Sequence, residues 1–86
     1  MDINQLISII KKKIQSQIIV KNIVIEDKSF LHKNHPGNQL DKFHLKILIQ
    51  SEELKKMSRI NSNKIIYKIL EKEMSQSIHS LQILIN

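Results

Sequence analysis

The sequence predicts one small α+β domain with the element order helix, strand, strand, short helix, helix, strand. Two observations lead to this prediction. The apolar residues change along the chain from helical spacing to strict alternation and back again. The last helical pattern is followed by a final apolar run, so the last strand has to return to the sheet by a crossover connection. We therefore expect a mixed three-stranded sheet with the helices packed on one of its faces.

The first half of the chain is predicted to form a helix, a strand and a long loop. Over residues 2–16, Asp2 and Gln5 approximate a capping box, and apolar residues follow the helical spacing. Residues 18–26 are dense in β-branched side chains, which favour a strand. Residues 27–42 are polar and hold the only glycine and the only proline, which predicts a loop. Loops of this length in small domains are usually functional or disordered.

The second half is predicted to form two strands around a helical segment. Residues 43–50 alternate between apolar and polar side chains, as in a half-buried strand. Ser51 is expected to cap a short helical turn. Asn61, Ser62 and Asn63 offer caps near the start of a longer helix, at about 61–75. The apolar stripe of that helix is formed by Ile66, Ile69, Leu70 and Met74, and a final strand is predicted over 78–85.

Length and composition favour a single domain over residues 1–86 in a reducing compartment. The chain has 86 residues and no cysteine, which excludes a disulfide-stapled scaffold. No apolar run approaches the ~18 residues of a membrane span. Lys11, Lys12 and Lys13 interrupt the first apolar stretch, unlike a signal peptide. These features predict a soluble cytoplasmic protein that does not bind membranes.

The net charge of +6 is typical of proteins that bind nucleic acid. However, isoleucine, lysine and asparagine are used heavily, alanine and threonine are absent, and Arg59 is the only arginine. This pattern indicates a coding bias, which makes lysine content weak evidence for phosphate contacts. We interpret most of the basic residues as solvated helix faces.

The four histidines are the candidate metal ligands. His32 and His35 bracket the Pro-Gly pair in the long loop, His44 begins the second predicted strand, and His79 begins the last one. Histidine is the commonest metal ligand and changes charge near neutral pH. Because the chain lacks cysteine, any soft-metal chemistry has to use imidazole or thiolates from a partner.

From about Ile18 to Ile85 the chain resembles the BolA family, and the resemblance implies a type II KH-like fold. The matching pieces keep their order and spacing. They are Asp27-x-Ser29-x-x-His32, Pro36-Gly37, Phe43-His44-Leu45-Lys46-Ile47, Ser51-Glu52, Ile65-Ile66-Tyr67-x-x-Leu70-x-x-Glu73 and Ile78-His79-Ser80-Leu81.

The resemblance also implies a partner and a cofactor. BolA-like proteins pair with a monothiol glutaredoxin, and a two-iron two-sulfur cluster is shared between the two proteins and glutathione. The resemblance assigns His79 as one ligand and His32 as the loop ligand, with His35 as the alternative. His44 is expected to have a surface or hydrogen-bonding role. Histidines can replace cysteines on one iron of such a cluster, so this chain would supply a half-site and carry no cluster alone.

A DNA-binding regulator is the alternative function. Basic and amide residues gather around the turn between the short and the long helix, as on a helix-turn-helix surface. They are Lys55, Lys56, Arg59, Asn61, Asn63 and Lys64. The sequence departs here from the family, which usually has an aromatic-x-Gly motif and an Arg-His-Arg motif at these places. The Gly-x-x-Gly clamp of nucleic-acid-binding KH domains is also missing. We therefore expect weak DNA binding.

Catalysis is not expected. Asp27, Ser29 and Ser51 lie near histidines in the sequence, but there is no nucleophile elbow and no pair of carboxylates. A single glycine excludes a glycine-rich phosphate loop. The sequence is thus interpreted as a non-enzymatic interaction protein, either a monomer or a homodimer alone, with a role related to iron or stress responses.

Overall fold

A computed structural model describes residues 2–29 and 42–86 of the chain. Most of the predicted loop over 27–42, including His32 and His35, lies outside these described residues. In the described part, the elements are α1 (Ile3–Gln17), β1 (Asn22–Asp27), β2 (Phe43–Gln50), α2 (Glu52–Lys55), α3 (Arg59–Ile69), α4 (Glu71–Gln76) and β3 (Ile78–Ile85). None of these helices has the length and hydropathy of a membrane-spanning segment.

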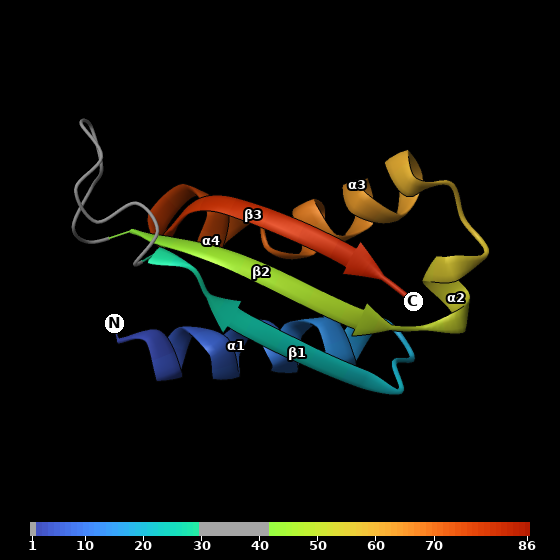
Figure 1. Cartoon of the computed structure of the whole chain (residues 1–86), viewed down its shortest axis with the longest axis horizontal. Helices are drawn as coiled ribbons and strands as arrows, with labels where there is room; N and C mark the ends of the chain where they lie inside the picture. Colours follow the sequence, from blue (N-terminus) through green and yellow to red (C-terminus); the bar gives the residue numbers. More distant parts are fainter. Residues whose placement is uncertain (1, 30–41) are drawn as a thin grey trace.

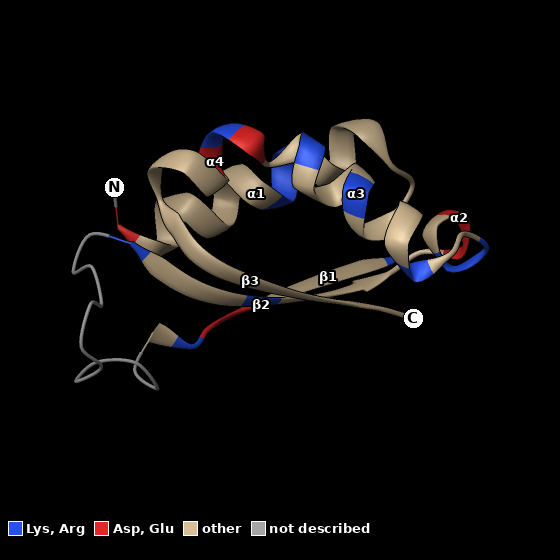
Figure 2. Ribbon diagram, turned by 90° about the horizontal axis from the view of Figure 1, so that it is seen from above, with Lys and Arg blue, Asp and Glu red and all other residues tan. Residues whose placement is uncertain are grey.

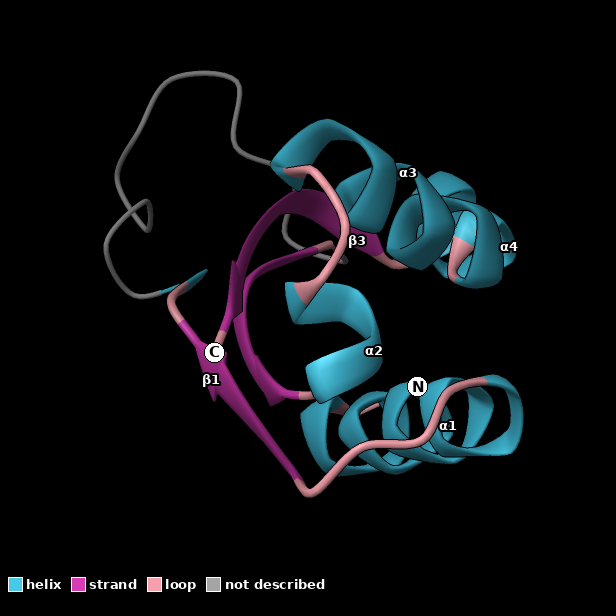
Figure 3. Cartoon of the chain, turned by 90° about the vertical axis from the view of Figure 1, so that its right-hand side faces the viewer, coloured by secondary structure: helices cyan, strands magenta, loops and turns pink. Residues whose placement is uncertain are grey.

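The three strands form one mixed sheet in the order β1-β2-β3. β1 pairs with β2 in antiparallel orientation, and β2 pairs with β3 in parallel orientation. The helices lie on one face of this sheet, and none of the described elements covers the other face (Figures 1 and 3). The predicted α+β class, the mixed sheet and the one-sided helical layer are therefore confirmed.

The hydrophobic core lies between the sheet and the helices. The alternation along β2 places Leu45, Ile47 and Ile49 on the helical side, and all three are buried. The apolar stripes of the helices face these side chains and complete the core. The helix residues that are fully or almost fully buried are Leu6, Ile10 and Ile14 of α1, Leu54 of α2 and Ile66 of α3, together with Leu70 between α3 and α4.

The first helix begins as predicted, but the first strand begins later than predicted. Asp2 and Gln5 form a reciprocal capping box at the start of α1. At the other end, the Ile18 N–H still donates to the Ile14 carbonyl at 2.9 Å. β1 then starts at Asn22 instead of residue 18. The β-branched residues 18–20 belong to the connection after the helix, and Ile18 is buried in the core.

The long helix predicted over 61–75 is two helices. α3 starts at Arg59 because the Ser58 side chain caps it and accepts from the Asn61 N–H at 3.1 Å. The helical path is interrupted at Leu70, whose φ of -98° and ψ of 19° depart from helix geometry, and α4 follows. The predicted cap at Ser51 is confirmed, since its Oγ accepts from the Leu54 N–H at 3.3 Å.

Candidate metal centre at the start of the third strand

His79 lies at an irregularity in the sheet, at the beginning of β3. The parallel register pairs Phe43 with Ile78 and His44 with Ser80, so His79 has no Cα partner on β2. β3 therefore has one extra residue relative to β2 at this point, as in a β-bulge. A β-bulge can redirect a side chain. Ile78 is buried in the core, whereas His79 and Ser80 are both exposed.

The exposed position of His79 differs from what simple alternation along the strand predicts. Strict alternation would place His79 on the core side of the sheet, together with Leu81, Ile83 and Ile85. The irregularity shifts the alternation by one residue, so Leu81 returns to the core side while His79 remains exposed. A period-two pattern in one strand cannot reveal an extra residue relative to its neighbour.

His44 is held in place by hydrogen bonds of its backbone with Ser29 and Lys28 and of its ring with Ser80. Its backbone N–H donates to Ser29 Oγ at 3.1 Å, and its carbonyl accepts from the Lys28 N–H at 2.7 Å. Its ring Nδ1 lies 2.6 Å from Ser80 Oγ, on the adjacent strand. The side chain is only 6% exposed. The predicted hydrogen-bonding role is confirmed, and the predicted surface position is wrong.

The two imidazoles form a pair at the shared end of two parallel strands. Their ring centroids are 4.7 Å apart, and the ring planes are inclined by 50°. The inner ring, of His44, is fixed by Ser80, and the outer ring, of His79, lies at the surface. Each histidine is the second residue of its strand, and parallel neighbours begin at the same edge of a sheet. That coincidence in the sequence could have predicted the pair.

Within residues 2–29 and 42–86, no three histidine or acidic side chains come together as a complete metal site. His79 and its neighbour His44 are therefore at most part of a coordination sphere in the described part of the chain. This donor set suits a shared centre whose other ligands come from elsewhere, because imidazole is a good ligand for iron. The predicted loop ligand His32 and its alternative His35 lie outside the described residues.

The basic residues of the alternative site lie at the opposite end of the sheet. Lys55 ends α2, Arg59 begins α3, and Lys56, Asn63 and Lys64 lie close to them in the chain. The four basic side chains are exposed, and Asn63 is half-buried. α2 is only a single turn, shorter than the first helix of a helix-turn-helix motif. Lys and Arg are also spread over the helical layer and are not gathered at this end (Figure 2).

The fold and the site together define a class: a small α+β domain with one mixed three-stranded sheet and a histidine at the start of each of its two parallel strands. The family model described as BolA-like protein matches residues 14–86. The chain therefore belongs to the BolA-like family.

Individual relatives agree with this assignment. The chain is 33% identical over 73 residues to the DNA-binding transcriptional regulator BolA of Haemophilus influenzae, covering 85% of this chain and 68% of that protein. It is 28% identical over 76 residues to the chloroplastic protein BOLA1 of Arabidopsis thaliana, covering 85% of this chain and 48% of that protein. The chain thus spans about half the length of the plant relative.

Solved structures share the fold. BolA1 from Arabidopsis thaliana aligns with a TM-score of 0.77 at 27% identity, covering 92% of this chain and 87% of that one. The solution structure of BolA1 from Mus musculus aligns with a TM-score of 0.72 at 17% identity, covering 90% of this chain and 60% of that one, a likeness that concerns the fold alone.

Proposed function

We propose that this chain is a partner protein that pairs with a monothiol glutaredoxin and contributes histidine ligands to a two-iron two-sulfur cluster shared with glutathione. The observation that carries the proposal is the exposed imidazole of His79, placed at a strand irregularity beside the buried ring of His44. The BolA-like family membership supports it. On this proposal the chain is not an enzyme.

The geometry fits a ligand that is presented to a partner. His79 lies between Ile78 and Ser80, which are both paired with β2, so the sheet holds the backbone on either side of it. The packed His44 ring limits the directions in which the His79 ring can turn. Neighbours that orient a ligating imidazole raise metal affinity because less freedom is lost on binding. We assign His79 as the ligand and His44 as the residue that positions it.

Either His32 or His35 would supply the second imidazole. Histidine ligands raise the reduction potential of a two-iron two-sulfur cluster relative to cysteine ligands. The thiolates have to come from the glutaredoxin and its glutathione, because this chain has no cysteine. A cluster held in this way is divided between two proteins, which suits a role in cluster assembly, transfer or iron regulation.

The test is reconstitution of the cluster with a monothiol glutaredoxin and glutathione. The wild-type complex should be coloured and show visible circular dichroism, and His79→Ala should lose most of that signal while the complex still forms in gel filtration. Gln82→Ala, also at an exposed position of β3, is the matched control and should keep the signal. A full spectrum in His79→Ala would show that the assignment of the ligand is wrong.

DNA binding is the second candidate function. It is favoured by one specific observation, since the Haemophilus influenzae relative is named a DNA-binding transcriptional regulator. In this chain the corresponding activity would use the exposed Lys55, Lys56, Arg59 and Lys64, with Asn63 beside them. Such a surface would contact phosphates mainly, because a one-turn α2 gives the next helix little support for insertion into a groove.

A further inference from the structure

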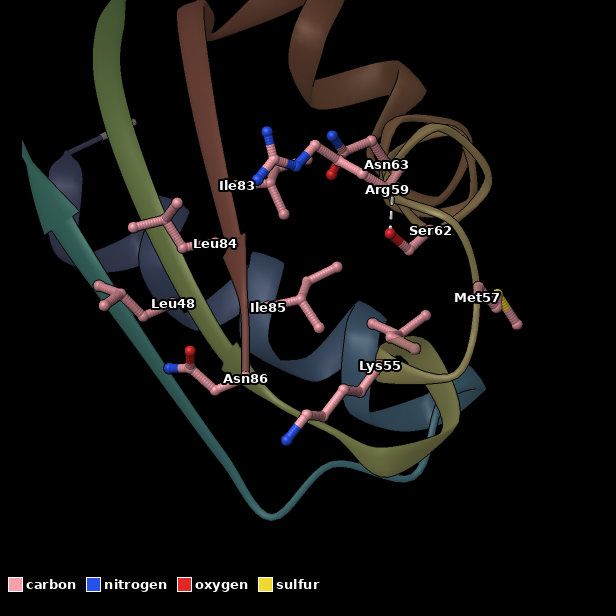
Figure 4. A pocket seen from close by; sticks show the side chains of 11 residues that line it. Leu48, Lys55, Met57, Arg59, Ser62, Asn63, Ile83, Leu84, Ile85 and Asn86 are labelled. Carbon is pink, nitrogen blue, oxygen red and sulfur yellow. Dashed lines mark hydrogen bonds between the residues drawn. The ribbon is translucent and has the colours of Figure 1, made fainter.

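A groove of about 390 Å³ lies along the C-terminal half of β3, at the end of the sheet opposite the histidine pair. Its residues come from both sides of β3, from α2 and from the beginning of α3 (Figure 4). Ile83 and Ile85 lie along the strand, and Leu54 and Met57 form part of the opposite wall. The groove therefore combines apolar side chains with polar ones, among them Arg59 and Asn63.

One wall of this groove is the free edge of a strand. β3 has β2 as its only neighbour in the described sheet. The Asn86 N–H donates to the Ile49 carbonyl at 2.8 Å, so the backbone of Asn86 points toward β2. Because peptide groups alternate in direction along a strand, those of Ile83 and Ile85 point away from β2 and into the groove. An added strand could pair with these groups.

The rest of the β3 edge is closed by a side chain. The Tyr67 hydroxyl, from α3, donates to the Leu81 carbonyl at 3.0 Å. This carbonyl points away from β2, in the same direction as that of Ile83. Tyr67 thus occupies the edge just before the groove begins, which confines any added strand to the segment from Ile83 onward.

The polar groups of the groove are suited to an acidic ligand. Figure 4 shows the Arg59 side chain extending from the start of α3 toward β3, and Lys55 at the other end of the groove near Asn86. The Oδ1 atom of Asn63, another lining residue, is buried without a hydrogen-bond partner. The two cations can pair with carboxylates, and the unmet Asn63 acceptor can accept a hydrogen bond from a peptide N–H.

On the open face of the sheet, an apolar row leads to the same edge. Val24, Leu48 and Leu84 are paired across the three strands, and Val24 and Leu84 are 44% and 37% exposed. A strand added beside β3 would place alternate side chains next to Leu84 and the others next to Arg59. The matching ligand alternates acidic residues on the helical side with apolar residues on the open side.

We propose that this groove binds an extended acidic peptide, which adds to the sheet as a fourth strand along Ile83–Ile85. The peptide pairs with the outward backbone groups of β3, and its carboxylates contact Arg59 and Lys55. A peptide fits better than single-stranded nucleic acid, because none of the described residues lining the groove is an aromatic on which bases could stack.

The binding test uses a fluorescein-labelled peptide, Gly-Ser-Glu-Val-Glu-Val-Glu-Ser-Gly, and fluorescence anisotropy with the full chain. We expect saturable binding that Arg59→Glu weakens by about tenfold or more, since it reverses a charge-assisted contact. Lys12→Glu makes the same change in net charge on α1 and should leave the affinity within about twofold. Equal weakening by both variants would show attraction by overall charge and overturn the proposal.

N-methylation of the peptide tests whether it binds as an added strand. Only alternate amides of an added strand face β3, so N-methylation of one alternate set should abolish binding while N-methylation of the other set should preserve it. Equal effects of the two sets would exclude strand addition. If an oligothymidylate binds more tightly than the peptide and loses that binding in Arg59→Glu, the ligand of the groove is nucleic acid and the peptide proposal is wrong. His79→Ala should bind the peptide normally, which separates this proposal from the one on iron–sulfur ligation.

Discussion

Glu73 of α4 is a buried carboxylate whose charge is balanced by a lysine of α1. Glu73 is 6% exposed, and its Oε2 forms an ion pair with Lys13 Nζ of α1 at 2.6 Å. Its Oε1 is buried without a hydrogen-bond partner. The lysine thus compensates a charge that water reaches poorly, and it ties the first helix to the last one.

Removal of this lysine is expected to destabilise the chain measurably. Lys13→Met should lower the free energy of unfolding by about 1–3 kcal/mol, because it leaves the carboxylate buried and unpaired. The double variant Lys13→Met, Glu73→Leu should recover most of that loss. Urea unfolding gives the free energy of unfolding of the wild type and of each variant. Lys21→Met is the control, since the Lys21–Glu52 pair is exposed at both side chains and should contribute less than about 1 kcal/mol. Similar losses in both single variants would contradict this account.

We expect the candidate ligand histidines to differ in whether a nearby histidine can take over as ligand. His79 lies on a strand, and His44 is the only histidine beside it in the described part of the chain. In the sequence, two residues separate His32 from His35, so either could supply the second ligand. His32→Ala should therefore reduce the colour of the reconstituted glutaredoxin complex less than His79→Ala does. The combination of His32→Ala and His35→Ala should match the His79→Ala loss. Full colour in the double variant would mean that neither His32 nor His35 is a ligand.

At the scale of the elements, Ser51 joins several parts of the fold. Its Oγ accepts from the buried Leu54 N–H at the start of α2 and donates to the Ile19 carbonyl at 3.0 Å. Its backbone N–H donates to the Asn86 carbonyl at 3.0 Å. One residue thus connects the end of β2 with a helix, with the segment before β1 and with the end of β3.

Loss of this hydroxyl should cost more than loss of an ordinary helix cap. Ser51→Ala is expected to lower stability by about 1.5–2.5 kcal/mol, since a buried N–H loses its acceptor and a second hydrogen bond disappears. Ser58→Ala removes the exposed cap of α3 and should cost about 0.5–1 kcal/mol. Thermal or urea unfolding of the two variants gives the comparison. A Ser51→Ala cost no larger than that of Ser58→Ala would assign Ser51 a capping role only.

The elements also show what local sequence can predict. The strands predicted over 43–50 and 78–85 are observed at those positions. Alternation marks the first of them, and flanking polar residues mark the ends of both. The division between α3 and α4 was not predictable in this way, since Leu70 is a good helix former and no glycine or proline accompanies the break.

The candidate metal site was partly predictable from the sequence. His79 was identified by resemblance, but its exposed position depends on the register between two strands.

At the scale of the whole molecule, the distribution of charge predicts how the chain responds to DNA. The net charge is +6, and the basic side chains are spread along the helical layer (Figure 2). We expect weak binding to duplex DNA that does not depend on sequence and falls steeply with added salt. Titration of two unrelated duplexes at about 50 and 200 mM salt measures this. Binding that distinguishes the duplexes at the higher salt, and that is lost in Arg59→Ala and Lys64→Ala, would favour the regulator instead.

The parallel pairing of β2 with β3 has a consequence for the way in which the chain reaches its fold. β1 and β2 are consecutive, whereas β3 reaches β2 only after α2, α3 and α4 have crossed the sheet. The chain has to close this segment before the contacts of β3 can form, so we expect the last strand to join late. His79 meets His44 only at that moment. An immature chain therefore lacks the histidine pair, and a partner that requires both rings selects molecules that have finished folding.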